Sequence, residues 1–127
     1  MPALPYETAV ILIDHGSRLP ESNRMLEVVA EQYRDLSGTA IVEAAHMELA
    51  EPTLAQAIDR CVQRGAQTIV IALFFLSPGQ HSTRDIPALV REALAGHPGV
   101  TCHITEPLGA DRRLAGLLHQ RVLETLD

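Results

Sequence analysis

The sequence predicts an α/β domain with a four-stranded parallel sheet flanked by helices. Strand-like and helix-like segments alternate four times along the chain, which is the pattern of a βαβ series. Residues 9–13 are continuously apolar, as in a central strand buried on both faces, and residues 54–62 carry apolar side chains at helical spacing. Because 127 residues are enough for one core but too few for two lobes, we expect a single domain over residues 1–127.

The first two helices are predicted from their ends and their apolar spacing. The strands around them are expected at residues 9–13, 40–45, 68–76 and 100–105. One helix begins near Pro20 and ends before Gly38. Its apolar side is formed by Met25, Val29, Tyr33 and Leu36. The next helix begins after Pro52 and ends at Gly65, and its apolar side must cover the sheet. That side is formed by Leu54, Ala57, Ile58, Cys61 and Val62.

The last two helices have weaker signals. The third helix is capped near Asp85, has Pro87 in its first turn and stops at residues 96–98. Asp111 can cap the final helix, which we expect to pack on the domain through one apolar side. That side is formed by Leu114, Leu117, Leu118 and Val122.

Composition excludes several classes of partner. The formal net charge is −6 and arginines are not clustered in a stripe, which argues against nucleic acid. Cys61 and Cys102 form no CxxC or pairing pattern, so we expect two reduced thiols. The first apolar run is far too short to span a bilayer and no basic residue precedes it. These features predict a cytoplasmic protein that contacts neither nucleic acid nor membrane.

Three good ligands for a divalent metal, His15, Glu48 and His81, each fall in a loop after an apolar strand. Singly, they have plainer interpretations as a structural histidine, a helix-start charge and an exposed loop imidazole. If the strands are parallel, however, their carboxyl ends meet at one edge of the sheet, where such folds bind ligands. Two imidazoles and a carboxylate suit Fe²⁺, Co²⁺, Ni²⁺ or Zn²⁺ better than Mg²⁺ or Ca²⁺. We therefore predict a metal site there.

Other polar residues near this edge are open to more than one interpretation. His46 lies two residues before Glu48, and it is a fourth ligand, a proton shuttle or, as we favour, a packed strand histidine. Asp14 stands where a histidine phosphatase has an arginine before its nucleophile, which disfavours that activity. Four arginines are expected along the same edge and as a group hint at an acidic ligand, although solvation explains each singly. They are Arg18, Arg84, Arg112 and Arg113.

Several segments together resemble a known family. They are IDHGSR at 13–18 with ESN at 21–23, EAAHMELAEP at 43–52, FFLSPGQH at 74–81 with DIP at 85–87, and PLG at 107–109. In order and content they resemble the class II tetrapyrrole chelatases, above all the short, single-domain sirohydrochlorin ferrochelatases. The resemblance implies a chelatase-like three-layer fold and insertion of Fe²⁺ into sirohydrochlorin to make siroheme. Insertion of Co²⁺ or Ni²⁺, as in short archaeal members, and a non-catalytic metal or tetrapyrrole carrier are the alternatives.

The resemblance also implies roles for individual residues. His15 and His81 match the two active-site histidines of the family, and Glu48 matches its metal-binding glutamate. For a substrate with carboxylates around an apolar ring, the predicted binding residues are Ser17, Arg18, Phe75, Gly79 and Arg84. The metal is then a substrate and no cofactor is permanently bound. The cysteine-rich tail of plant members is absent from this sequence, so we expect no iron–sulfur cluster, and a single lobe implies a homodimer.

Overall fold

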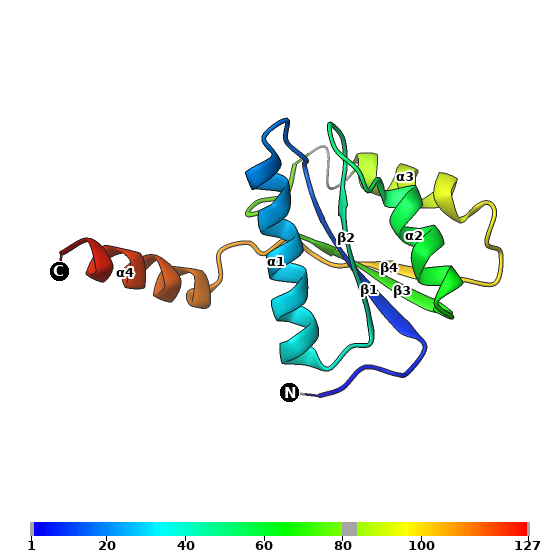
Figure 1. Cartoon of the computed structure of the whole chain (residues 1–127), viewed down its shortest axis with the longest axis horizontal. Coiled ribbons are helices and arrows are strands. Elements are labelled where there is room, and N and C mark those ends of the chain that lie inside the picture. Colours follow the sequence, from blue (N-terminus) through cyan, green and yellow to red (C-terminus); the bar gives the residue numbers. More distant parts are fainter. Residues whose placement is uncertain (1, 80–83, 127) are drawn as a thin grey trace.

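The computed structural model describes residues 2–79 and 84–126, which form a parallel sheet with helices on both sides (Figure 1). The strands are β1 (Thr8–Asp14), β2 (Ile41–His46), β3 (Thr68–Leu73) and β4 (Thr101–Ile104). The helices between and after them are α1 (Pro20–Ser37), α2 (Leu54–Gln63), α3 (Ile86–Leu94) and α4 (Arg112–Leu126). The strands pair in parallel in the order β2-β1-β3-β4. The α/β class and the parallel sheet predicted from the sequence are confirmed.

The two faces of the sheet have separate cores. On one face α2 and α3 pack over the strands, and Ile11 and Ile58 are fully buried there. On the other face α1 lies over β1 and β2, and Leu26 is fully buried against Leu12. Strand β1 is buried along nearly its whole length, as its unbroken apolar run predicts.

The sequence predicts the buried side of α2 better than that of α1. Four of the five predicted apolar residues of α2 are buried, and the fifth, Val62, is partly buried against the same core. Thr53 caps the helix in a capping box with Gln56. In α1, by contrast, Met25 and Leu36 are 52% and 65% exposed, so the predicted side is wrong at both ends. The residues buried instead are Leu26 and Ala30. Because long side chains at neighbouring positions are similarly apolar, spacing alone did not determine which of them faces the sheet.

The prediction that the final helix, α4, packs on its own domain is wrong. Asp111 does accept a hydrogen bond from the Arg113 backbone N–H at 2.8 Å, so the predicted start is right. None of the residues of α4 is buried, however, and the helix extends away from the sheet (Figure 1). Leu114, Leu117, Leu118 and Val122 are therefore not core residues. In the part of the chain that the structure describes, no helix is both long and apolar enough to cross a membrane.

The two cysteines are free thiols, as predicted. Cys61 on α2 is fully buried, and burial raises its pKa to about 12. Cys102 on β4 is partly buried, and burial raises its pKa to about 11. Both groups are therefore protonated, and so poorly nucleophilic, at neutral pH.

Candidate functional site

The carboxyl ends of β1, β2 and β3 lie level with one another, so their loops meet at one edge of the sheet. Asp14 pairs in register with His46, and Ile13 pairs with Leu73. The loops continue the pairing beyond the strands, since the Glu48 backbone N–H donates to the His15 carbonyl at 3.2 Å. The structure thus brings the His15 and Glu48 loops into contact. The third predicted ligand, His81, lies outside the residues that the structure describes.

The imidazole of His15 packs against the ring of Phe75. The ring centroids are 4.3 Å apart and the planes are inclined by 46°. His15 is exposed, whereas Phe75 is only 6% exposed, so the exposed imidazole packs on a buried aromatic ring. The neighbouring Leu76 is 67% exposed. Leu76 therefore presents more apolar surface at this edge than Phe75 does.

A partly buried hydrogen bond joins the ends of β1 and β2, next to the loops that carry the predicted ligands His15 and Glu48. The Asp14 Oδ1 atom lies 2.6 Å from Nδ1 of His46 and also accepts a hydrogen bond from the Gly16 backbone N–H at 3.0 Å. Because a carboxylate oxygen only accepts, Nδ1 is the donor. His46 is fully buried, and its Nε2 has no hydrogen-bond partner in the described part of the chain. Of the three interpretations of His46, the structure favours the packed strand histidine. Its partner Asp14 was not foreseen as part of the site.

Gly16 and Leu49 have backbone conformations that follow from the close approach of the loops. Gly16 has φ of +87°, and a Cβ atom there would lie 1.8 Å from the Glu48 carbonyl oxygen. Only glycine fits this position. Leu49 has φ of +70° and is the only non-glycine residue in the described ranges with a positive φ. Such strain is concentrated at functional sites in proteins, which draws attention to the loop after β2.

The loop that carries His15 is also tied to α1. The Ser17 backbone N–H donates to Oδ1 of Asn23 at 2.9 Å, and Nδ2 of Asn23 donates back to the Ser17 carbonyl at 2.7 Å. The hydroxyl of Ser17 accepts a hydrogen bond from the Leu19 backbone N–H at 3.0 Å. Ser17 was predicted to bind substrate, and here its side chain shapes the loop. Asn23 was not predicted as a site residue. Its place in the ESN segment at 21–23 is the signal that could have indicated it.

The predicted arginines differ in their surroundings. Arg18 and Arg84 are exposed. Arg113 instead makes two hydrogen bonds of 2.8 Å to the carboxylate of Asp111, which holds the pKa of Asp111 well below its usual range. Arg113 is thus already paired. Within residues 2–79 and 84–126, no three histidine, cysteine or acidic side chains lie in an arrangement that would hold a metal ion.

Comparisons with known proteins find relatives along almost the whole chain. Residues 9–125 match the model of the family CbiX. The chain is 44% identical over 117 residues to the chloroplastic sirohydrochlorin ferrochelatase of Arabidopsis thaliana, which covers 92% of this chain and 52% of that protein. It is 33% identical over 138 residues to the sirohydrochlorin cobaltochelatase of Methanopyrus kandleri, which covers 93% of this chain and 96% of that protein.

A solved structure has the same fold. SirB from Bacillus subtilis with Fe3+ superimposes with a TM-score of 0.85 at 24% identity, and the match covers 91% of this chain and 46% of that chain. This chain therefore spans about half the length of the Arabidopsis and Bacillus proteins.

Proposed function

The chain belongs to the CbiX family, and from this we propose that it inserts Fe²⁺ into sirohydrochlorin to make siroheme. The observation that carries the proposal is the contact between the His15 and Glu48 loops at the carboxyl edge of the sheet. The relative with 44% identity is named a ferrochelatase, which favours iron. The archaeal relative with 33% identity is named a cobaltochelatase, which makes Co²⁺ the second candidate metal.

Metal insertion needs ligands and bases close together, because two pyrrole N–H protons leave as the metal sheds its water. We assign His15, Glu48 and His81 to the metal, which is a substrate and not a resident cofactor. A neutral imidazole binds such metals well and also accepts protons, so His15 can serve either step. The Glu48 carboxylate balances the charge of the incoming cation.

Recognition of the macrocycle divides between apolar and cationic groups. The exposed side chain of Leu76 would contact the flat face of the ring, while Phe75 holds His15 at its angle. Arg18 and Arg84 would pair with the carboxylates at the rim, since guanidinium binds carboxylate with two parallel hydrogen bonds. Gly79 and Ser17 belong to the loops that border the same edge.

The remaining proposals concern assembly and compartment. One sheet edge offers one wall to a flat macrocycle, so we propose a homodimer whose two edges enclose the substrate. Both thiols are free, which suits a reducing compartment such as the cytoplasm.

The test is anaerobic incubation of the protein with sirohydrochlorin and Fe²⁺, Co²⁺ or Ni²⁺ in turn, with the absorption change followed over many equivalents of substrate. We expect repeated turnover that is fastest with Fe²⁺ and that is largely lost in His15→Ala. Binding that stops at one equivalent would indicate a carrier instead of an enzyme. No absorption change with any of the three metals would contradict the proposal.

A further inference from the structure

Leu49, directly after the proposed ligand Glu48, lies in a strained backbone conformation. Its φ of +70° falls in the left-handed region, which glycine and asparagine adopt readily and leucine does not. A leucine persists in this conformation only where the surrounding structure imposes it. The fold alone would therefore favour glycine or asparagine at this position.

The loop that carries Leu49 is anchored on both sides. Before Leu49, the Met47 backbone N–H donates a hydrogen bond to the Asp14 carbonyl at 2.9 Å. After Leu49, the Pro52 carbonyl accepts a hydrogen bond from the His46 backbone N–H, also at 2.9 Å. These contacts fix the chain before and after Leu49, and so they hold its backbone in the strained conformation.

The side chain of Leu49 does not offset this strain by burial. It is 54% exposed, and it belongs to neither of the two hydrophobic cores. Apolar surface stabilises a fold in proportion to the area that is removed from water, so a side chain that stays half exposed contributes little. Strain that the fold itself does not need indicates a functional position.

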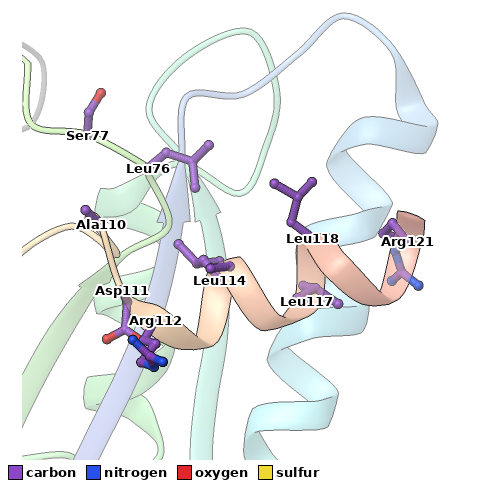
Figure 2. A pocket seen from close by; sticks show the side chains of 11 residues that line it. Leu76, Ser77, Ala110, Asp111, Arg112, Leu114, Leu117, Leu118 and Arg121 are labelled. Atoms are coloured by element: carbon purple, nitrogen blue, oxygen red, sulfur yellow. The ribbon is translucent and has the colours of Figure 1, made fainter. Parts of the chain in front are cut away.

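Each loop that follows a strand carries an exposed leucine at this edge of the sheet. These residues are Leu19, Leu49, Leu76 and Leu108. Leu76 also borders an open, largely apolar groove of about 970 Å³, together with Leu114 and Leu118 of α4 (Figure 2). Leu49 does not line that groove. Its exposed and strained position is therefore the better indicator of a ligand at this edge.

We propose that Leu49 is a substrate-binding residue whose side chain packs against the flat apolar face of the sirohydrochlorin ring, beside the metal. This inference rests on the proposed function, in which the neighbouring Glu48 binds the metal. The ring surrounds its central metal on all sides, so a side chain next to a metal ligand meets ring atoms. The strained turn then holds apolar surface against the ring. Such a contact tightens ring binding and does not by itself accelerate metal insertion.

Leu49→Asn tests this contact, because asparagine tolerates a positive φ but has a short, polar side chain. The full chain is titrated into sirohydrochlorin without metal or oxygen, and binding is followed by the fluorescence of the ring. We expect Leu49→Asn to raise the Kd at least about tenfold, which corresponds to about 1.4 kcal/mol. Leu49→Met keeps an apolar side chain of similar volume and should bind the ring as wild type does.

Leu36→Asn is the matched control for the loss of an exposed leucine. Leu36 is 65% exposed and lies near the end of α1, away from the carboxyl edge of the strands. Its substitution should leave the Kd for sirohydrochlorin unchanged. In insertion assays, Leu49→Asn should raise KM for sirohydrochlorin with kcat nearly unchanged. A loss confined to kcat would overturn the proposal.

Urea unfolding separates this role from a structural one. Leu49→Gly and Leu49→Asn should keep or raise the urea midpoint, because both residues relieve the strain of a positive φ. A lower midpoint in both variants would mean that Leu49 supports the fold, and would overturn the proposal. A folded Leu49→Asn that binds the ring as tightly as wild type does would overturn it as well.

The outcomes also separate this inference from the proposed function. If wild type inserts metal and Leu49→Asn binds the ring unchanged, only the inference fails. If wild type binds the ring without inserting metal and Leu49→Asn binds it more weakly, only the proposed catalysis fails. A wild-type chain that binds no sirohydrochlorin would refute both. A changed mass of Leu49→Asn in light scattering, with unchanged ring affinity, would assign Leu49 to a contact between copies and overturn the proposal.

Discussion

Gly16 is where the two loops of the candidate site come closest, and Gly16→Ala tests whether that approach matters. A Cβ atom there would lie 1.8 Å from the Glu48 carbonyl oxygen, whereas ordinary contact begins near 3.4 Å. The Glu48 loop would therefore have to move by about 1.6 Å, the difference between these distances. No flexible side chain can absorb this movement, because the atom that is met belongs to the backbone.

The expected loss of stability has two parts. A shift of that size breaks the hydrogen bonds from Met47 N–H to the Asp14 carbonyl and from Glu48 N–H to the His15 carbonyl. Each such bond contributes about 1 kcal/mol. The positive φ of Gly16 adds about 1–2 kcal/mol for any residue with a Cβ atom. The free energy of unfolding should therefore fall by about 3–4 kcal/mol.

Gly65→Ala is the matched control, since Gly65 has φ of +99° but nothing within 4 Å of an added Cβ atom. It should lose only the backbone part, about 1–2 kcal/mol, in urea unfolding followed by circular dichroism. Metal insertion should slow at least about tenfold in Gly16→Ala, because a displaced loop that raises the activation free energy by about 1.4 kcal/mol gives that factor. The insertion rate of Gly65→Ala should be unchanged. If the two variants were equal in both stability and insertion rate, the tight approach of the loops would have no role.

Three further predictions concern the same edge and the core. Glu48→Gln should slow metal insertion more than Glu51→Gln does. Both substitutions keep the shape of the side chain, but only the first removes the carboxylate of a proposed metal ligand. Equal insertion rates would mean that the wrong carboxylate was chosen. Asp14→Ala should lower the free energy of unfolding by about 2–4 kcal/mol, since it leaves a buried imidazole donor unpaired. Asp14→Asn, which keeps the acceptor, should cost clearly less in the same urea titration, and an equal cost would contradict the role of the hydrogen bond. Burial raises the pKa of Cys61 from 9.0 to about 12, so the unfolded chain loses this proton first as the pH rises and stability should decline between pH 9 and 12. Cys61→Ala should show a shallower decline, and an unchanged pH profile would argue against the shift.

Local patterns predict the sheet and α2 because each depends on few neighbours. The unbroken apolar run of β1 is enough to indicate a strand buried on both faces. Thr53 and Gln56 lie three residues apart, so the capping box of α2 is visible in the sequence. The apolar side of α4 is equally visible, yet spacing says only that a helix has such a side. Which surface covers it depends on tertiary or quaternary contacts that no local pattern contains.

The candidate site is predicted less completely, because its supporting contacts join distant residues. Strand ends indicate His15 and Glu48 directly. The bond between Asp14 and His46, 32 residues apart, depends on the register of β1 with β2. A shift of one residue in that register would turn His46 away from Asp14, and the sequence does not state the register. The close approach of Gly16 to the Glu48 carbonyl depends on the same register and cannot be predicted from the sequence for the same reason.

Neighbouring residues at this edge have two different roles, because some hold the loops in place and others are proposed metal ligands. The loop positions are set by backbone hydrogen bonds, by the Asp14 carboxylate and by the Asn23 amide. Exchange of the exposed His15 or Glu48 side chain should therefore leave the loops in place and remove only a proposed ligand. Changes at Asp14, Gly16 or Asn23 should instead move the loops with every proposed ligand still present. Loss of insertion with unchanged stability is thus the signature of a ligand, whereas loss of both identifies a residue that positions it.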